Sequence, residues 1–474
     1  MIGFSTSQRK RFLLFAVIVI AIVALGGFSP WQTGEEHAAP SAGHHDPVAP
    51  VLLALAAILV SAKIGGELFE RMNQPAVLGE LIVGVVLGNL ALINPSWDFF
   101  GPLRAEHIDV QWASAVDILA RIGVILLLFE VGLESNVAEM RRVGVSSFLV
   151  ATVGVVAPFA LGYFASATFI TKVPESILAM NAEFDISNIH IFIGATLCAT
   201  SVGITARVLK DLGKLHIKES RIVLGAAVID DVMGLIILAV AAGIIVAGET
   251  GVPMELAAVL EITGIAIGFL VGAIVVGITV VPKILKKIAI LRTHGVMLIS
   301  ALLFCFVFSY LANLAGLAAI VGAFAAGLIL EEVHFTEFKE KKHLHELLAP
   351  VTTFLVPIFF VVMGIQVRLE TFMDGNVLGL ALALTVAAFI GKQVCGLAVV
   401  EKGLDRLSIG LGMVPRGEVG LIFASIGKGL GVVDDSIFSA VVIMVIATTL
   451  VTPPLLKFSL ARGERRSQNR PSEA

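Results

Sequence analysis

Long runs of apolar residues recur along the chain, and short polar segments separate them. Each run is close to the length of helix, about 20 residues, that spans the apolar core of a bilayer. We therefore predict an all-α polytopic membrane protein with about 13 transmembrane helices, in addition to an N-terminal leader or anchor. The leader or anchor comprises residues 1–28, and its apolar run covers residues 12–28. The thirteen further spans lie at about residues 50–70, 75–93, 113–133, 143–170, 189–207, 219–247, 256–281, 293–313, 317–331, 347–367, 376–400, 404–428 and 435–458.

The composition agrees with this pattern and narrows the function. Hydrophobic residues make up 57% of the chain and charged residues only 15%. A net charge of -4 gives no reason to expect a nucleic-acid partner. Cys198, Cys305 and Cys395 all fall inside apolar spans, so neither a disulfide framework nor a clustered metal site is indicated. We expect the lipid bilayer as a partner and no cofactor.

The segment before the thirteen spans has two parts. Residues 1–28 carry basic residues followed by an apolar run and contain no clear cleavage site, so a signal peptide and a retained anchor both stay open. Residues 29–49 are polar and form an extracytoplasmic linker. The linker offers four potential metal ligands, although a short solvated linker is the simpler interpretation: His37, His44, His45 and Asp46.

The distribution of basic residues predicts the orientation of the spans. When the spans alternate sides from a cytoplasmic N-terminus, lysines and arginines concentrate in the cytoplasmic segments, as the positive-inside rule requires. The C-terminus is then cytoplasmic, and residues 459–474 form a short cytoplasmic tail. The outer loops contain few basic residues: Arg104, Lys172, Arg368 and Lys428.

The spans predict an internal repeat. The span at 256–281 acts as a linking helix, with six spans before it (residues 50–247) and six after it (residues 293–458). Because seven spans separate equivalent positions, the second set enters from the opposite face, which is the layout of two inverted-topology six-helix repeats. The linking helix also carries glycines at four-residue spacing, which predict close helix packing: Gly264, Gly268 and Gly272.

Two spans at matching places in the repeats are interrupted. The span at 189–207 contains Thr200 and Ser201, and the span at 404–428 contains the run from Pro415 to Glu418. A pair of broken, crossing helices is the strongest sequence sign of a transporter's binding site. We therefore expect the binding site at these breaks.

The span at 219–247 carries two adjacent acids, Asp230 and Asp231. A rise of about 1.5 Å per residue places them about 16 Å from Glu219, near the middle of a bilayer. Carboxylates at this depth are costly and mark functional sites. The simpler alternative is that both aspartates stay protonated and act only as inert hydrogen-bonding groups. We predict instead an ion or proton site.

The basic residue predicted at the same depth suggests different roles for the two acids. Lys392 is a basic residue at comparable depth, and a buried ammonium needs a carboxylate, so we pair Lys392 with Asp230. This assigns Asp231 to a cation such as Na+ or to a proton, but not to both. The hydroxyls of Thr200 and Ser201 and unwound carbonyls could complete the shell, although a bond to the helix's own carbonyls is equally expected.

Arg416 and Glu418 lie within the second interrupted span. They can pair with each other or with the first break. We interpret them as structural support for the broken helices and assign them no catalytic role.

Five motifs distributed over both halves of the chain resemble the monovalent cation:proton antiporter superfamily. They are NQPAVLGELIVGVVLG (residues 73–88), LLLFEVGLE (126–134), CATSVGITARVL (198–209), VIDDV (228–232) and VPRGEVGLI (414–422). With Lys392, the double aspartate is similar to the electrogenic bacterial Na+/H+ antiporters, the NapA- and NhaA-like group. The resemblance implies a thirteen-helix homodimer in the bacterial inner membrane, with a core domain that moves against a dimerisation domain. It also implies Asp231 as the cation ligand and Asp230 as the partner of Lys392.

Other functions fit the sequence less well. Potassium-efflux relatives usually carry Gln where this chain has Asp230, and they add a large nucleotide-binding domain, which argues against K+ efflux. K+/H+ exchange or K+ efflux is nevertheless the alternative within the superfamily. A cation channel and a sodium-coupled carrier of organic anions also stay open. An intramembrane aspartyl protease would need its two acids on different helices. We therefore predict a transporter, not an enzyme, that exchanges Na+ or Li+ for H+.

Overall fold

The computed structural model describes residues 48–72, 74–104, 110–134, 144–180, 184–214, 217–249, 256–288, 290, 295–330 and 343–468. Over these residues the structure is helical and contains no strand. The predicted leader and all but the end of the predicted linker lie outside the described part of the chain.

The chain divides into two compact units. The first comprises residues 1–124 and 349–369, and the second comprises residues 125–348 and 370–474. Helices α4 (Gln111–Glu134) and α15 (Leu344–Ile365) contribute to both. The units follow spatial packing and not the predicted sequence halves, so the inverted repeat stays a prediction.

The first unit is built on close helix contacts made by glycines. Helix α2 (Val48–Arg71) and helix α3 (Ala76–Gly88) approach at Gly65 and Gly79. A Cβ atom on Gly79 would lie 2.0 Å from the carbonyl oxygen of Gly65, so no larger residue fits without separating the helices. Short 3-10 turns at Leu90–Leu92, Pro95–Trp97 and Gly101–Arg104 follow.

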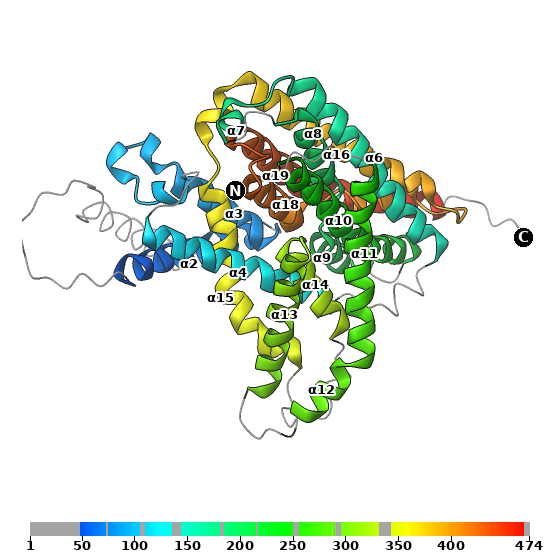
Figure 1. The fold of residues 1–474 in the computed structure, drawn as a ribbon. Helices are drawn as coiled ribbons and strands as arrows, with labels where there is room; N and C mark the ends of the chain where they lie inside the picture. Colours follow the sequence, from blue (N-terminus) through cyan, green and yellow to red (C-terminus); the bar gives the residue numbers. More distant parts are fainter. Residues whose placement is uncertain are drawn as a thin grey trace, which may run out of the picture. The chain divides into compact units, whose positions relative to one another are not determined.

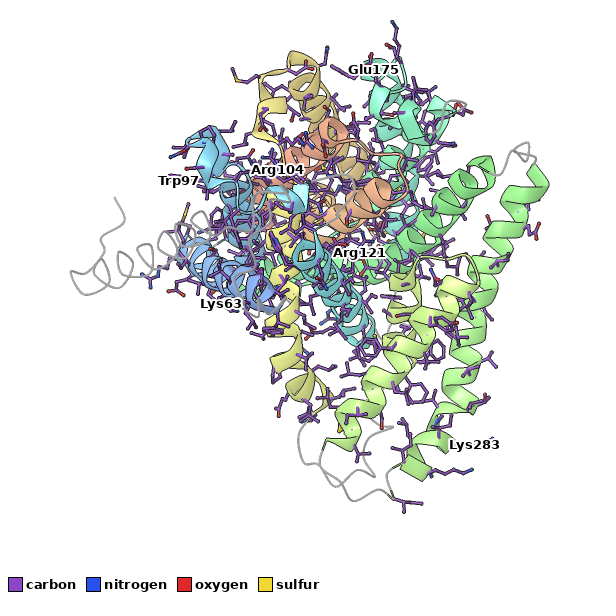
Figure 2. The ribbon with its side chains drawn as sticks, turned by 60° about the vertical axis from the view of Figure 1, so that its left-hand side comes forward. Lys63, Trp97, Arg104, Arg121, Glu175 and Lys283 are labelled. Atoms are coloured by element: carbon purple, nitrogen blue, oxygen red, sulfur yellow. The ribbon has the colours of Figure 1, made fainter. Side chains whose placement is uncertain are left out.

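Polar side chains hold the carboxyl end of α3. Asn89 Nδ2 donates 2.8 Å hydrogen bonds to the carbonyls of Val85 and Val367. Arg104, labelled in Figure 2, donates from Nη1 to the carbonyl of Gly88 at 2.7 Å. These bonds satisfy carbonyls that the end of a helix leaves without an internal donor.

The second unit contains most of the helices, and most of these are labelled in Figure 1. They are α6 (Val145–Phe169), α7 (Glu175–Met180), α8 (Ile186–Cys198), α9 (Val202–Asp211), α10 (Lys218–Glu249), α11 (Leu256–Thr279), α12 (Val281–Ile288), α13 (Val296–Leu314), α14 (Ala319–Ile329), α16 (Gly375–Cys395), α17 (Arg406–Gly412), α18 (Gly417–Gly429) and α19 (Asp435–Gln468). Helix α6 packs against α8, α10 and α16.

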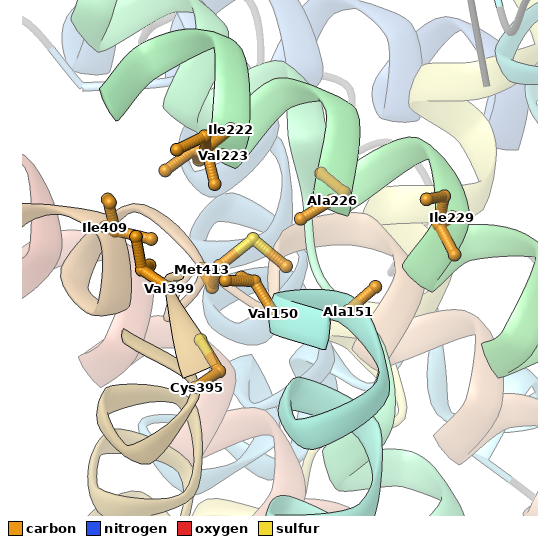
Figure 3. Packing of buried hydrophobic residues seen from close by; sticks show 11 residues of the cluster. Val150, Ala151, Ile222, Val223, Ala226, Ile229, Cys395, Val399, Ile409 and Met413 are labelled. Carbon is orange, nitrogen blue, oxygen red and sulfur yellow. The ribbon is translucent and has the colours of Figure 1, made fainter. Parts of the chain in front are cut away.

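One apolar cluster fixes the amino-terminal half of α10 (Figure 3). Val150 and Ala151 of α6 meet Ile222, Val223 and other residues of α10 in this cluster. Further members come from α16, from α17 and from the segments that follow these two helices. Burial of this face sets the rotation of α10, and therefore the directions in which its two acids point.

Within the described residues, seven helices are long and apolar enough to cross a membrane: α2, α6, α10, α13, α15, α16 and α19. The chain is therefore an integral membrane protein. Helices α11 and α12 form a further candidate span, which bends by 46°. Shorter apolar helices lie at residues 76–88, 186–198, 319–329 and 419–429. The total of thirteen spans stays a prediction.

The predicted close packing of Gly264, Gly268 and Gly272 is wrong within the described chain. Apart from the chain neighbours and the helix's own backbone, no described atom lies within 4 Å of a Cβ built on any of the three. The close approach of α11 is made one turn further on, where a Cβ on Gly277 would lie 2.4 Å from Cβ of Ile329. Four-residue glycine spacing shows that a face is narrow, but not that another helix of the same chain covers it.

We predict that Gly79→Ala destabilises the protein. The new methyl group meets backbone and not a flexible side chain, so the helices must separate, at a cost of about 1–3 kcal/mol. The thermal midpoint in detergent should fall clearly below that of the wild type. Gly264→Ala is the control, because its position is open and alanine favours a helix. Equal midpoints for the two variants would contradict this account.

Candidate functional site

Two helix breaks lie at the predicted positions. Helix α8 ends at Cys198 and α9 begins at Val202, and α17 ends at Gly412 and α18 begins at Gly417. Pro415 explains the second break, because proline lacks an N–H and disfavours helical backbone in the residue before it. Gly417 has φ of +42°, and a Cβ there would lie 2.6 Å from Ser201 Oγ. Glycine therefore lets the two breaks approach.

The breaks satisfy each other's backbone groups. The N–H of Ser201 donates to the carbonyl of Pro415 at 2.8 Å. Thr200 Oγ1 donates to the carbonyl of Met413 at 3.3 Å. Thr205 Oγ1 donates to the carbonyl of Gly412 at 2.7 Å. Unwound backbone at membrane depth is tolerated only where protein groups or water satisfy it, and here the facing break supplies the groups.

Arg416 completes this cross-link. Its guanidinium is fully buried, and Nη1 donates to the carbonyl of Ala199 in the first break. The sequence predicts that Arg416 pairs either with Glu418 or with the first break, and the structure shows the bond to the first break. Glu418 lies in α18, but its side chain is outside the described part of the structure.

Next to the breaks, Asp230 forms a buried ion pair. Its Oδ1 lies 2.8 Å from Lys392 Nζ on α16, and both side chains are fully buried. Thr200 also interacts with the Asp230 carboxylate. A Cβ on Gly154 would lie 3.6 Å from Lys392 Nζ, so a glycine on α6 faces the ammonium group. Each charge would be strongly unfavourable here without the other.

Asp231 projects about 100° away from Asp230 around the helix. It is less buried than its neighbour and lines a cavity of about 10 Å³. That volume is close to the space one water molecule needs. The lining residues come from α4, α10, α14, α18 and the first break: Leu128, Val131, Ala199, Asp230, Asp231, Gly234, Leu235, Phe324, Val419 and Phe423.

Thr200 and Ser201 do not line this cavity. One interpretation of the sequence is that the Thr200 hydroxyl bonds a carbonyl of its own helix. In the structure it donates instead to the carbonyl of Met413 in the opposite break. The residue of the first break that lines the cavity is Ala199. Sequence reasoning also missed Phe324 and Phe423, because an aromatic residue within an apolar span looks like ordinary core.

Comparisons with known proteins identify the family of this chain. The family model described as "Sodium/hydrogen exchanger, transmembrane" matches residues 53–462, so the chain belongs to the sodium/hydrogen exchanger family. It is 38% identical over 436 residues to the high-affinity Na+/H+ antiporter NhaS3 of Synechocystis, covering 86% of this chain and 90% of that protein.

Two further relatives widen the comparison. The Na+/H+-K+ antiporter GerN of Bacillus cereus is 36% identical, covering 87% of this chain and 96% of that protein. The Na+/H+ antiporter of Enterococcus hirae is 29% identical, covering 85% of this chain and 96% of that protein.

We predict that Thr205→Val weakens the contact between the breaks. The change removes a buried hydroxyl that bonds the other break and leaves the Gly412 carbonyl without that donor, at a cost of about 1 kcal/mol. Thr196→Val is a matched control, since that hydroxyl is equally buried but bonds Phe192 in its own helix. Thr205→Val should lower the thermal midpoint and the transport rate more than Thr196→Val. An equal effect of both changes would show that the cross-break bond is dispensable.

Proposed function

We propose that the protein exchanges Na+, or Li+, for H+ across the membrane by alternating access at the two adjacent acids. One observation carries the proposal: Asp230 is held by Lys392, while Asp231 faces a water-sized cavity beside two crossed helix breaks. The sodium/hydrogen exchanger family and the three relatives, which are Na+/H+ antiporters, support the same exchange.

The exchange follows from competition at one carboxylate. Asp231 binds a cation only when it is deprotonated, so a proton and a cation exclude each other. Carbonyls of the breaks and water can supply the remaining oxygen ligands for the cation. If the core carries the occupied site to either face of the membrane, the two gradients are coupled without covalent chemistry.

Lys392 provides a second proton in this proposal. When a cation enters, the ammonium group loses its proton, so two protons move for each cation and the exchange is electrogenic. Each net charge then carries about 2.3 kcal/mol per 100 mV of membrane potential.

The finer architecture belongs to the same proposal. We infer thirteen spans in two inverted repeats, a homodimer in the bacterial inner membrane and a cytoplasmic C-terminus. Exchange of K+ for H+ is the second candidate, because the relative GerN is a Na+/H+-K+ antiporter. Adjacent acids on one helix argue against a protease, which shares a proton between acids on separate helices.

We predict that Asp231→Asn abolishes exchange. The amide cannot carry the exchanged proton and binds a cation weakly, so dequenching of a pH dye in proteoliposomes should fall to background. Asp374→Asn is the control, because Asp374 caps the amino end of α16 through the N–H of Asn376 and asparagine caps equally well. Full activity of Asp231→Asn would refute the assigned role.

We predict that removal of Lys392 makes the exchange electroneutral. Lys392→Ala leaves the Asp230 carboxylate buried and unpaired, so the double variant Asp230→Asn/Lys392→Ala is tested beside it. Exchange by folded variants should continue without dependence on an imposed membrane potential. Voltage dependence that persists in both would rule out the two-proton scheme.

A further inference from the structure

The walls of the Asp231 cavity are almost entirely apolar. Apart from the two acids, its lining consists of aliphatic residues, one glycine and the rings of Phe324 and Phe423. Both rings are almost fully buried. The walls therefore contribute shape to the site and no side-chain ligands.

One pair of residues sets the width of the cavity beside the carboxylate. Gly234 lies three residues after Asp231, so both share a face of α10. A Cβ built on Gly234 would lie 3.9 Å from Phe423 Cζ on α18, and no other described atom outside its own helix and chain neighbours is that close. The tip of the ring thus faces the one lining position of α10 that has no side chain.

The small volume has a chemical consequence. A cavity of about 10 Å³ has room for a single water-sized particle and none for a cation with its hydration shell. The cation must exchange most of its shell for protein oxygens. Cavity size and the number of ligands are the two properties on which selectivity among alkali cations depends.

We infer that Gly234 and Phe423 determine which alkali cation Asp231 accepts, by setting the space left beside its carboxylate. This inference rests on the proposed cation exchange. Neither residue coordinates the ion. A smaller space favours Li+ and Na+ over K+, and a larger space admits K+.

The test uses two substitutions that change the space in opposite directions. Gly234→Ala adds a methyl group where it meets only the tip of a ring at ordinary contact distance. Phe423→Leu removes most of that ring. Gly268→Ala, at an open position of α11, and Phe192→Leu, in a buried ring that does not line the cavity, are the controls.

The readout is the ratio of apparent affinities for K+ and Na+ in proton-coupled exchange by proteoliposomes. Gly234→Ala should lower the apparent affinity for K+ relative to that for Na+ by about tenfold. Phe423→Leu should raise this ratio by a similar factor. A change of this size is expected when one or two methylene groups are added to or removed from a packed pocket. The control variants should keep the wild-type ratio.

If Gly234 and Phe423 had only a structural role, both variants would reduce transport of every cation alike. The ratio of the K+ and Na+ affinities would then not shift in opposite directions. If both variants exchange cations at the wild-type ratio, the inference is wrong and the exchange function stands. If the wild type itself shows no exchange of any alkali cation for protons, the proposed function fails instead. A Phe423→Leu protein that does not fold leaves Gly234→Ala to decide, because an unchanged ratio in that variant alone contradicts the inference.

Discussion

The candidate site depends on one buried ion pair. Asp230 and Lys392 are both fully buried, and their charged groups lie 2.8 Å apart. Removing one partner would leave the other charge buried without compensation, so the pair fixes α10 and α16 relative to each other. Because Asp231 is the next residue on the same helix, this constraint also fixes the direction of its carboxylate. The cavity then follows from the elements that pack around that direction.

The helix breaks place the second constraint on the site. Breaking a helix inside a membrane exposes carbonyl and amide groups that lipid cannot satisfy. Here the breaks supply each other's partners, from Ser201 to Pro415 and from Arg416 to Ala199. Ala199, whose carbonyl accepts the bond from Arg416, lines the same cavity as the two acids. Oxygen dipoles next to a carboxylate are a suitable setting for a hard monovalent cation.

Much of this arrangement is predictable from sequence, because charges and prolines in apolar spans are strong local signals. The acids, the pairing with Lys392 and the positions of both breaks follow from such signals. The walls of the cavity do not, since Phe423 and Gly234 become neighbours only when α18 packs on α10. For the same reason the bond from Thr200 to Met413 joins residues more than two hundred positions apart. The glycines of α11 show the opposite error, because their spacing predicts a contact that the described chain does not make.

In the proposed exchange, the Asp231 carboxylate holds either a proton or an alkali cation. The most direct test measures the apparent KM for Na+ over a range of pH in proteoliposomes, with the same pH on both sides. Competition predicts that the KM rises at least tenfold for each unit by which the pH falls below the pKa of Asp231, and more steeply where Lys392 must also release its proton, while the maximal rate stays constant. A KM that does not change with pH would show that protons and cations bind independently, and would contradict the central claim.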